Sequence, residues 1–124
     1  MSVISCQLLV ICMCIFCQII KKEIKAEIVF EDEEIIVIKD INPKASVHLL
    51  LIPKRHIESL ITLEKKDASL LQEIVFRAKL LAEELGFASS GYKLILNSGQ
   101  GAGQLVPHLH FHLLSGSEIR DFAI

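Results

Sequence analysis

The sequence predicts an α+β fold: a mainly antiparallel sheet of five strands with one long and one short helix. Five short segments are apolar or alternate between apolar and polar residues, and turn residues separate them, as is typical of strands. Only residues 67–85 keep apolar side chains at the 3.6-residue spacing of a long amphipathic helix. The chain has 124 residues, 52% of them apolar, which suits one domain with a substantial core.

Local signals set the expected limits of these elements. The polar run 32–34 suits a hairpin, Pro53 ends a buried strand, and Gly86 stops the long helix. Pro107 has no N–H to donate and belongs at a strand start or a bulge. In chain order we expect a short helix over 14–23, strands over 28–31, 35–39 and 47–52, the long helix over 67–85, and strands over 92–96 and 106–114.

The net charge bears on which ligands the protein binds, and the positions of the cysteines bear on where it is located. The net charge of −2 gives no electrostatic case for binding nucleic acid. The four cysteines lie at positions 6, 12, 14 and 17, too clustered for a disulfide framework, so we expect a reducing, cytoplasmic location.

Residues 1–13 form an apolar N-terminal extension of the domain over residues 14–124. The extension is too short to span a bilayer and lacks a basic start and a clear cleavage site, so no membrane contact is expected. Met13 is an alternative start, and a signal or membrane anchor remains the competing interpretation.

The most informative segment is His108-Leu109-His110-Phe111-His112, in which imidazoles and apolar side chains alternate. In a strand, this period of two puts the three imidazoles on one face and the apolar side chains on the other. Imidazole can attack, donate, accept or bind a metal near neutral pH. The pattern therefore predicts a core on one face of the strand and chemistry on the other.

With other segments in the same order, this motif resembles the histidine triad (HIT) family, and within it the Hint branch. The similarity runs from about residue 14 to residue 116. Besides the triad, it is carried by Phe16-Cys17-Gln18-Ile19-Ile20, Asp40-Ile41-Asn42-Pro43, the segment from His48 to His56, Asn97 and Gly103-Gln104.

The resemblance implies a HIT-like fold that dimerises into one continuous sheet. It also implies hydrolysis of nucleoside 5′-phosphoramidates of the AMP type, a purine nucleotide substrate, and a covalent nucleotidyl-histidine. In that mechanism His110 is the nucleophile, His112 contacts the phosphate, and His48 is a further active-site histidine.

The resemblance also assigns nucleotide contacts. Asp40 would bind the ribose hydroxyls, Ile41 would contact the base, and Asn97, Gly103 and Gln104 would hold the α-phosphate. Glycines let backbone N–H groups approach a phosphate, although an ordinary hairpin explains the loop composition equally well. A turn-capping role is the alternative for the aspartate.

A second expected site is a structural zinc ion. Cys14 and Cys17 have a chelating spacing, and some relatives complete such a site with histidines that correspond to His56 and His108. The alternative is a pair of small buried thiols in the core.

One departure from the resemblance concerns Leu105, which stands where many Hint-type proteins have a serine that helps protonate the leaving group. Leucine donates nothing, so amine release would need another proton source. Two other functions therefore stay open: a dinucleoside polyphosphate hydrolase, and a nucleotide-binding or interaction protein without turnover.

Overall fold

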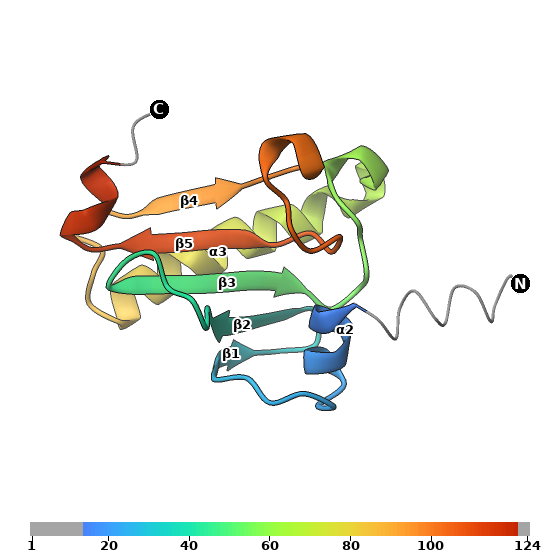
Figure 1. Ribbon diagram of the computed structural model, residues 1–124, viewed down its shortest axis with the longest axis horizontal. Coiled ribbons are helices and arrows are strands. Elements are labelled where there is room, and N and C mark those ends of the chain that lie inside the picture. Colours follow the sequence, from blue (N-terminus) through green and yellow to red (C-terminus); the bar gives the residue numbers. More distant parts are fainter. Residues whose placement is uncertain (1–13, 122–124) are drawn as a thin grey trace, which may run out of the picture.

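The computed structural model describes residues 14–121, and the expected extension over residues 1–13 lies outside them. The chain forms an antiparallel sheet in the order β1-β2-β3-β5-β4 with a long helix behind it (Figure 1). Its helices and strands are α2 (Ile15–Ile20), β1 (Ile28–Glu31), β2 (Ile35–Lys39), β3 (Val47–Pro53), α3 (Ala68–Glu84), β4 (Lys93–Leu96) and β5 (Phe111–Ser115). Short 3-10 helices are η1 (Leu60–Thr62), η2 (Lys65–Asp67), η3 (Gln100–Ala102) and η4 (Ser117–Asp121).

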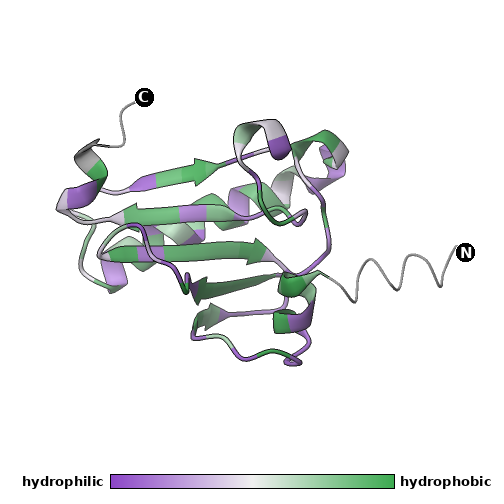
Figure 2. Ribbon diagram, in the orientation of Figure 1, coloured by the Kyte–Doolittle hydropathy of each residue, from purple (hydrophilic) through white to green (hydrophobic). Residues whose placement is uncertain are grey.

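One face of the sheet packs against α3 and holds the main core. Alternate residues of the central strands point toward this helix, so Val37, Leu51 and Leu113 meet Ile74 and Leu81 in one buried cluster. The strands in the middle of the sheet are accordingly the most continuously apolar part of the ribbon (Figure 2). This confirms the expected α+β architecture with one long helix.

The opposite face is only partly covered. Helix α2 packs on the side chains of Ile36, Ile38, Leu50 and Ile52, near one end of β1, β2 and β3 (Figure 1). In the register of the sheet Leu50 lies opposite His112, so this histidine is on the same face as α2. On this face of β5, His112 borders a cavity, whereas Leu114 is buried in a small cluster with Ala45 and Ile119.

Two elements differ from the expected limits by more than one residue. Strand β5 begins at Phe111, not at residue 106, because Pro107 cannot donate and the N–H of Leu109 donates to the carbonyl of Ile57 at 2.6 Å. Leu109 is nevertheless fully buried against α3, so the alternation of faces holds. Helix α2 ends at Ile20, and the chain turns away through Lys22, whose φ is +65°. Within residues 14–121 no helix has the length and apolarity that crossing a membrane requires.

Candidate active site

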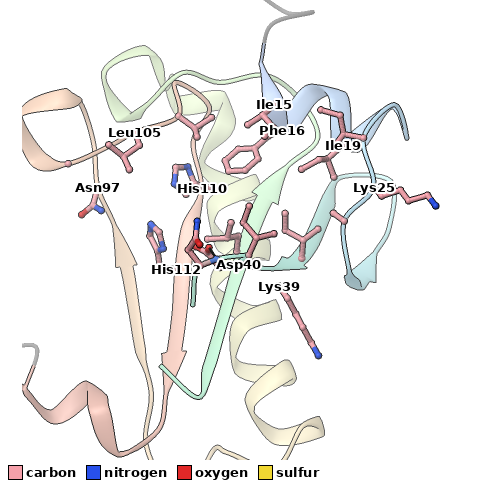
Figure 3. Close-up of a pocket in the computed structure, with 18 residues that line it drawn as sticks. Ile15, Phe16, Ile19, Lys25, Lys39, Asp40, Asn97, Leu105, His110 and His112 are labelled. Carbon is pink, nitrogen blue, oxygen red and sulfur yellow. Dashed lines mark hydrogen bonds between the residues drawn. The ribbon is translucent and has the colours of Figure 1, made fainter. Parts of the chain in front are cut away.

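A cavity of about 370 Å³ opens on the α2 face of the sheet (Figure 3). Ligand pockets in proteins start at about 300 Å³, so the space suits a mononucleotide. Helix α2 forms one wall, the turn after β2 a second, and the loop before β5 a third. The lining residues are Ile15, Phe16, Ile19, Ile24, Lys25, Ala26, Ile38, Lys39, Asp40, Ile41, Asn42, Leu50, Asn97, Gly103, Leu105, Val106, His110 and His112.

His110 lines this cavity with a fixed tautomer. Its Nδ1 lies 2.8 Å from the carbonyl oxygen of His108, which can only accept, so Nδ1 carries the proton. Nε2 of the neutral ring is then an unprotonated nitrogen. Burial lowers the pKa of His110, which keeps the ring neutral at pH 7. The ring of Phe16 packs edge-on against it, with the centroids 5.0 Å apart.

His112 has its tautomer set by a chain of hydrogen bonds. The N–H of Lys44 donates to Nδ1 of His48 at 3.0 Å, so the proton of that ring is on Nε2. This Nε2 lies 2.9 Å from Nδ1 of His112, to which it donates. Nε2 of His112 is left as a donor. Burial first, and the nearby His110 and His48 second, lower the pKa of His112 to about 4.

His48 is buried and is not among the residues that line this cavity. Its connection to the cavity is the hydrogen bond to Nδ1 of His112. Burial lowers the pKa of His48, and the carboxylate of Asp40, 3.4 Å from Nε2, opposes that effect. In this geometry the role that the sequence predicts for His48 would be exerted through His112.

Asp40 caps a turn and also lies on the cavity wall. Its Oδ1 accepts the N–H of Asn42 at 2.8 Å, which caps the turn, and the residue also lines the cavity. Ile41 lies at the mouth of the cavity with 86% of its surface exposed. An apolar side chain exposed to that degree is available to cover a ligand.

Gln104 is used by its own loop. Its Nε2 donates to the carbonyls of Glu58 at 2.7 Å and Val106 at 2.9 Å, while its Oε1 accepts the N–H of Gly99 at 2.7 Å. Both amide protons are used within the loop in this structure, and Gln104 does not line the cavity, whereas Asn97 and Gly103 do. The phosphate contact of Gln104 stays a prediction.

The four residues expected to bind zinc converge. Sγ of Cys14 and Sγ of Cys17 lie 3.4 and 3.6 Å from Nδ1 of His108, and Nδ1 of His56 lies 3.2 Å from the second sulfur and 3.1 Å from His108. Zn–S and Zn–N bonds of about 2.3 and 2.0 Å place tetrahedral ligands roughly 3.3 to 3.8 Å apart. These donors fit such an ion.

The tautomer of His108 agrees with this fit. Its Nε2 donates to the carbonyl of Pro53 at 2.8 Å, so Nδ1, which faces the sulfurs, is unprotonated. Burial lowers the pKa of His108 to about 4, and burial also lowers that of His56. Both rings are neutral at pH 7, as metal ligands must be.

Sequence reasoning missed helix α2 as a wall of the cavity. Ile15, Phe16 and Ile19 line it, and Phe16 touches the rings of both His108 and His110. A signal was present, because Cys14 and Cys17 bracket the phenylalanine and fix its place beside His108.

The chain is similar over most of its length to known proteins. A family model described as scavenger mRNA decapping enzyme C-term binding matches residues 13–122. An uncharacterized HIT-like protein of Chlamydia muridarum is 46% identical over 109 residues, covering 88% of this chain and 86% of that protein. The crystal structure of a HIT family hydrolase from Legionella pneumophila has a TM-score of 0.81 and 47% identity, covering 83% of this chain and 92% of the other.

Two further solved structures are those of a nucleotide-binding and of a zinc-bound histidine triad protein. A histidine triad nucleotide-binding protein from Candida albicans has a TM-score of 0.73 and 36% identity, covering 81% of this chain and 72% of the other. A zinc-bound histidine triad family protein from Mycobacterium smegmatis has a TM-score of 0.77 and 28% identity, covering 92% of this chain and 82% of the other. With the motif, the fold and these relatives in agreement, the chain belongs to the histidine triad (HIT) family.

Proposed function

We propose that this protein hydrolyses nucleoside 5′-phosphoramidates of purine nucleotides, as Hint-type proteins do, through a covalent intermediate on His110. The observation that carries the proposal is the hydrogen bond from Nδ1 of His110 to the carbonyl of His108, which leaves Nε2 unprotonated on the cavity wall. The similarity to a HIT family hydrolase and to a HIT nucleotide-binding protein supports the same class of reaction.

The proposed reaction has two displacements at phosphorus. Nε2 of His110 forms a bond to the phosphorus while the P–N bond to the amine breaks, and the departing amine takes a proton from water. Water then attacks the phosphorus and gives a proton to the hydroxide that the first step left, the bond to His110 breaks, and the nucleoside monophosphate leaves with the ring neutral again. The donor on Nε2 of His112 stabilises the negative charge on the phosphoryl oxygens in both steps.

The remaining wall residues orient the nucleotide in this proposal. The Asp40 carboxylate accepts hydrogen bonds from the ribose hydroxyls, and Ile41 with the apolar side chains of α2 covers the base. Asn97 and Gly103 face the phosphate from the loop. This division places the nucleoside toward Asp40 and the phosphorus beside the two histidines of the wall.

A mass measurement tests the intermediate. We expect the intact protein, quenched after brief exposure to adenosine 5′-phosphoramidate, to gain the mass of one adenylyl group on His110. His110→Ala, with an unchanged circular dichroism spectrum, should show no adduct and lose AMP release by about a thousandfold or more. Unchanged AMP release by this variant would contradict the proposal.

Leu105 gives a second candidate function some support, because the residue supplies no proton to a leaving group. A nucleotide-binding protein without turnover would bind AMP in calorimetry but release none from any phosphoramidate. Faster cleavage of a diadenosine polyphosphate than of a phosphoramidate would instead indicate a dinucleoside polyphosphate hydrolase.

We also propose that Cys14, Cys17, His56 and His108 hold one structural zinc ion, since their spacing fits it and a related protein is zinc-bound. The ion would fasten α2 to the segments that carry the two histidines. Elemental analysis should find one zinc per chain, and Cys17→Ser should lose the zinc and lower Tm. A full-length protein purified without chelator that contains no zinc, and gains none on dialysis against it, would contradict the site.

A further inference from the structure

A second cavity of about 340 Å³ lies beside the first, and Leu105 lines both of them. The other residues that form its wall include Glu58, Ser59 and Ile61 from the segment after β3, and Gln104 and Pro107 from the loop before β5. Leu105 therefore lies between the nucleotide cavity and a neighbouring space that the roles described above leave without an occupant.

The walls of this second cavity are held in place by hydrogen bonds. Nε2 of Gln104 donates to the carbonyl of Glu58, which joins the loop to the segment after β3. Oγ of Ser59 accepts the N–H of Ile61 at 3.2 Å and so caps η1. The space is formed before a ligand arrives, which lowers the entropic cost of filling it.

Two large apolar side chains face solvent at this cavity. Leu105 is 91% exposed and Ile61 is 82% exposed. Covering both with an apolar group removes hydrocarbon surface from water, which favours binding by about 25 cal/mol per Å². The cavity thus suits an apolar body.

The position of the cavity identifies which part of a substrate would enter it. Asp40 and Leu105 lie on opposite sides of His110 in the first cavity (Figure 3). If the ribose binds at Asp40 and the phosphorus lies at His110, the group on the far side of the phosphorus points toward Leu105. That group is the one that leaves.

The charge of the lining selects among leaving groups. Among residues 14–121, Glu58 is the one charged residue that lines the second cavity, and no Lys, Arg or His of this range is part of its wall. A phosphate-bearing leaving group would meet a carboxylate with no cation to balance it. A departing amine, which is cationic at pH 7, meets an opposite charge.

We propose that the cavity formed by Ile61, Leu105, Pro107 and Glu58 is the leaving-group subsite, and that it takes amines with an apolar body in preference to phosphate-bearing groups. This inference rests on the proposed phosphoramidate hydrolysis. Leu105 then contributes apolar contact at the position where it cannot contribute a proton.

The test compares the kcat/KM of adenosine 5′-(N-benzyl)phosphoramidate with that of unsubstituted adenosine 5′-phosphoramidate. The ratio of the two should fall about five- to tenfold in Leu105→Ser and in Ile61→Ser. Leu60→Ser is the matched control, because Leu60 is the neighbour of Ile61 in η1, is 42% exposed and is not part of the cavity wall. This control should keep both the ratio and the basal activity of the wild type.

A second readout does not depend on turnover. Benzylamine added to the AMP-loaded protein should shift the methyl NMR resonances of Leu105 and Ile61 but not those of Leu60. Glu58→Lys should raise cleavage of a diadenosine polyphosphate relative to the benzyl compound. An unchanged ratio in both serine variants, with no shift from benzylamine, would overturn the subsite, whereas no AMP from either substrate would overturn the proposed function itself.

Discussion

His108, His110 and His112 belong to one motif, yet a different partner fixes each ring. The first donates from Nε2 to a carbonyl and turns Nδ1 toward the sulfurs, and the second donates from Nδ1 and keeps Nε2 unprotonated. The third accepts at Nδ1 from His48 and keeps a donor on Nε2. Hydrogen bonding alone thus makes three identical side chains a candidate ligand, a candidate nucleophile and a candidate anion donor.

The hydrogen bond between His48 and His112 predicts coupled mutational effects. We expect His112→Ala to lower kcat by about a hundredfold, because a donor to the developing charge is lost. His48→Ala should lower kcat by less, because His48 acts through its neighbour. In steady-state kinetics of the double variant, the second substitution should add almost nothing to His112→Ala. Additive losses would indicate that His48 contacts the substrate independently.

At the level of elements, strong periodic patterns were predicted most accurately. The strands over 28–31 and 35–39 have their expected limits, and the long helix differs from its predicted range by one residue at each end. The 3-10 helices were missed, because three to five residues are too few to show a period. The predicted start of β5 was wrong because Leu109 donates to the carbonyl of Ile57, a residue distant in sequence, in place of a strand-to-strand hydrogen bond.

In the loop before β5, two glycines allow a test of backbone strain with a matched control. Gly103 lines the nucleotide cavity at φ +94°, a region that L-residues rarely adopt, and nothing lies within 4 Å of an added Cβ. Gly103→Ala should therefore act through backbone strain of about 1 kcal/mol, lowering Tm by a few degrees and raising KM. Gly101→Ala, with equal space and no positive φ, should leave both unchanged. Equal effects of the two variants in thermal melts and kinetics would refute this explanation.

At the level of the whole molecule, one face of the sheet packs on α3, and the other carries α2 and the cavity. Alternation in the motif was enough to predict that Leu109, Phe111 and Leu113 join the core. Of the three histidines on the other face, His110 and His112 line the cavity, whereas His108 faces the two thiols. The sequence could also nominate Asp40 and the cysteine–histidine cluster. It could not show that the amide of Gln104 is consumed by Glu58 and Val106, because those hydrogen bonds arise only from tertiary packing.

The open end of the sheet leads to a prediction of oligomeric state. Strand β4 is an edge strand, and Val75 and Phe76 of α3 are about half exposed. We propose a homodimer that joins two β4 edges into one sheet, and we expect sedimentation at twice the 13.9 kDa chain mass. Phe76→Glu should give monomers, whereas Ile28→Glu at the opposite edge should not. Monomeric wild-type protein at micromolar concentration would exclude this assembly.

The double duty of His108 affects how experiments on this molecule can be interpreted. Its ring faces the two thiols, and its backbone oxygen accepts the hydrogen bond from Nδ1 of His110, the candidate nucleophile. A side-chain substitution at position 108 keeps this oxygen but removes the ring that anchors the same stretch of backbone beside the thiols. An inactive His108 variant therefore does not show which atoms contact the phosphorus. Mutational scans of this motif will rank the residue as essential for reasons of architecture alone.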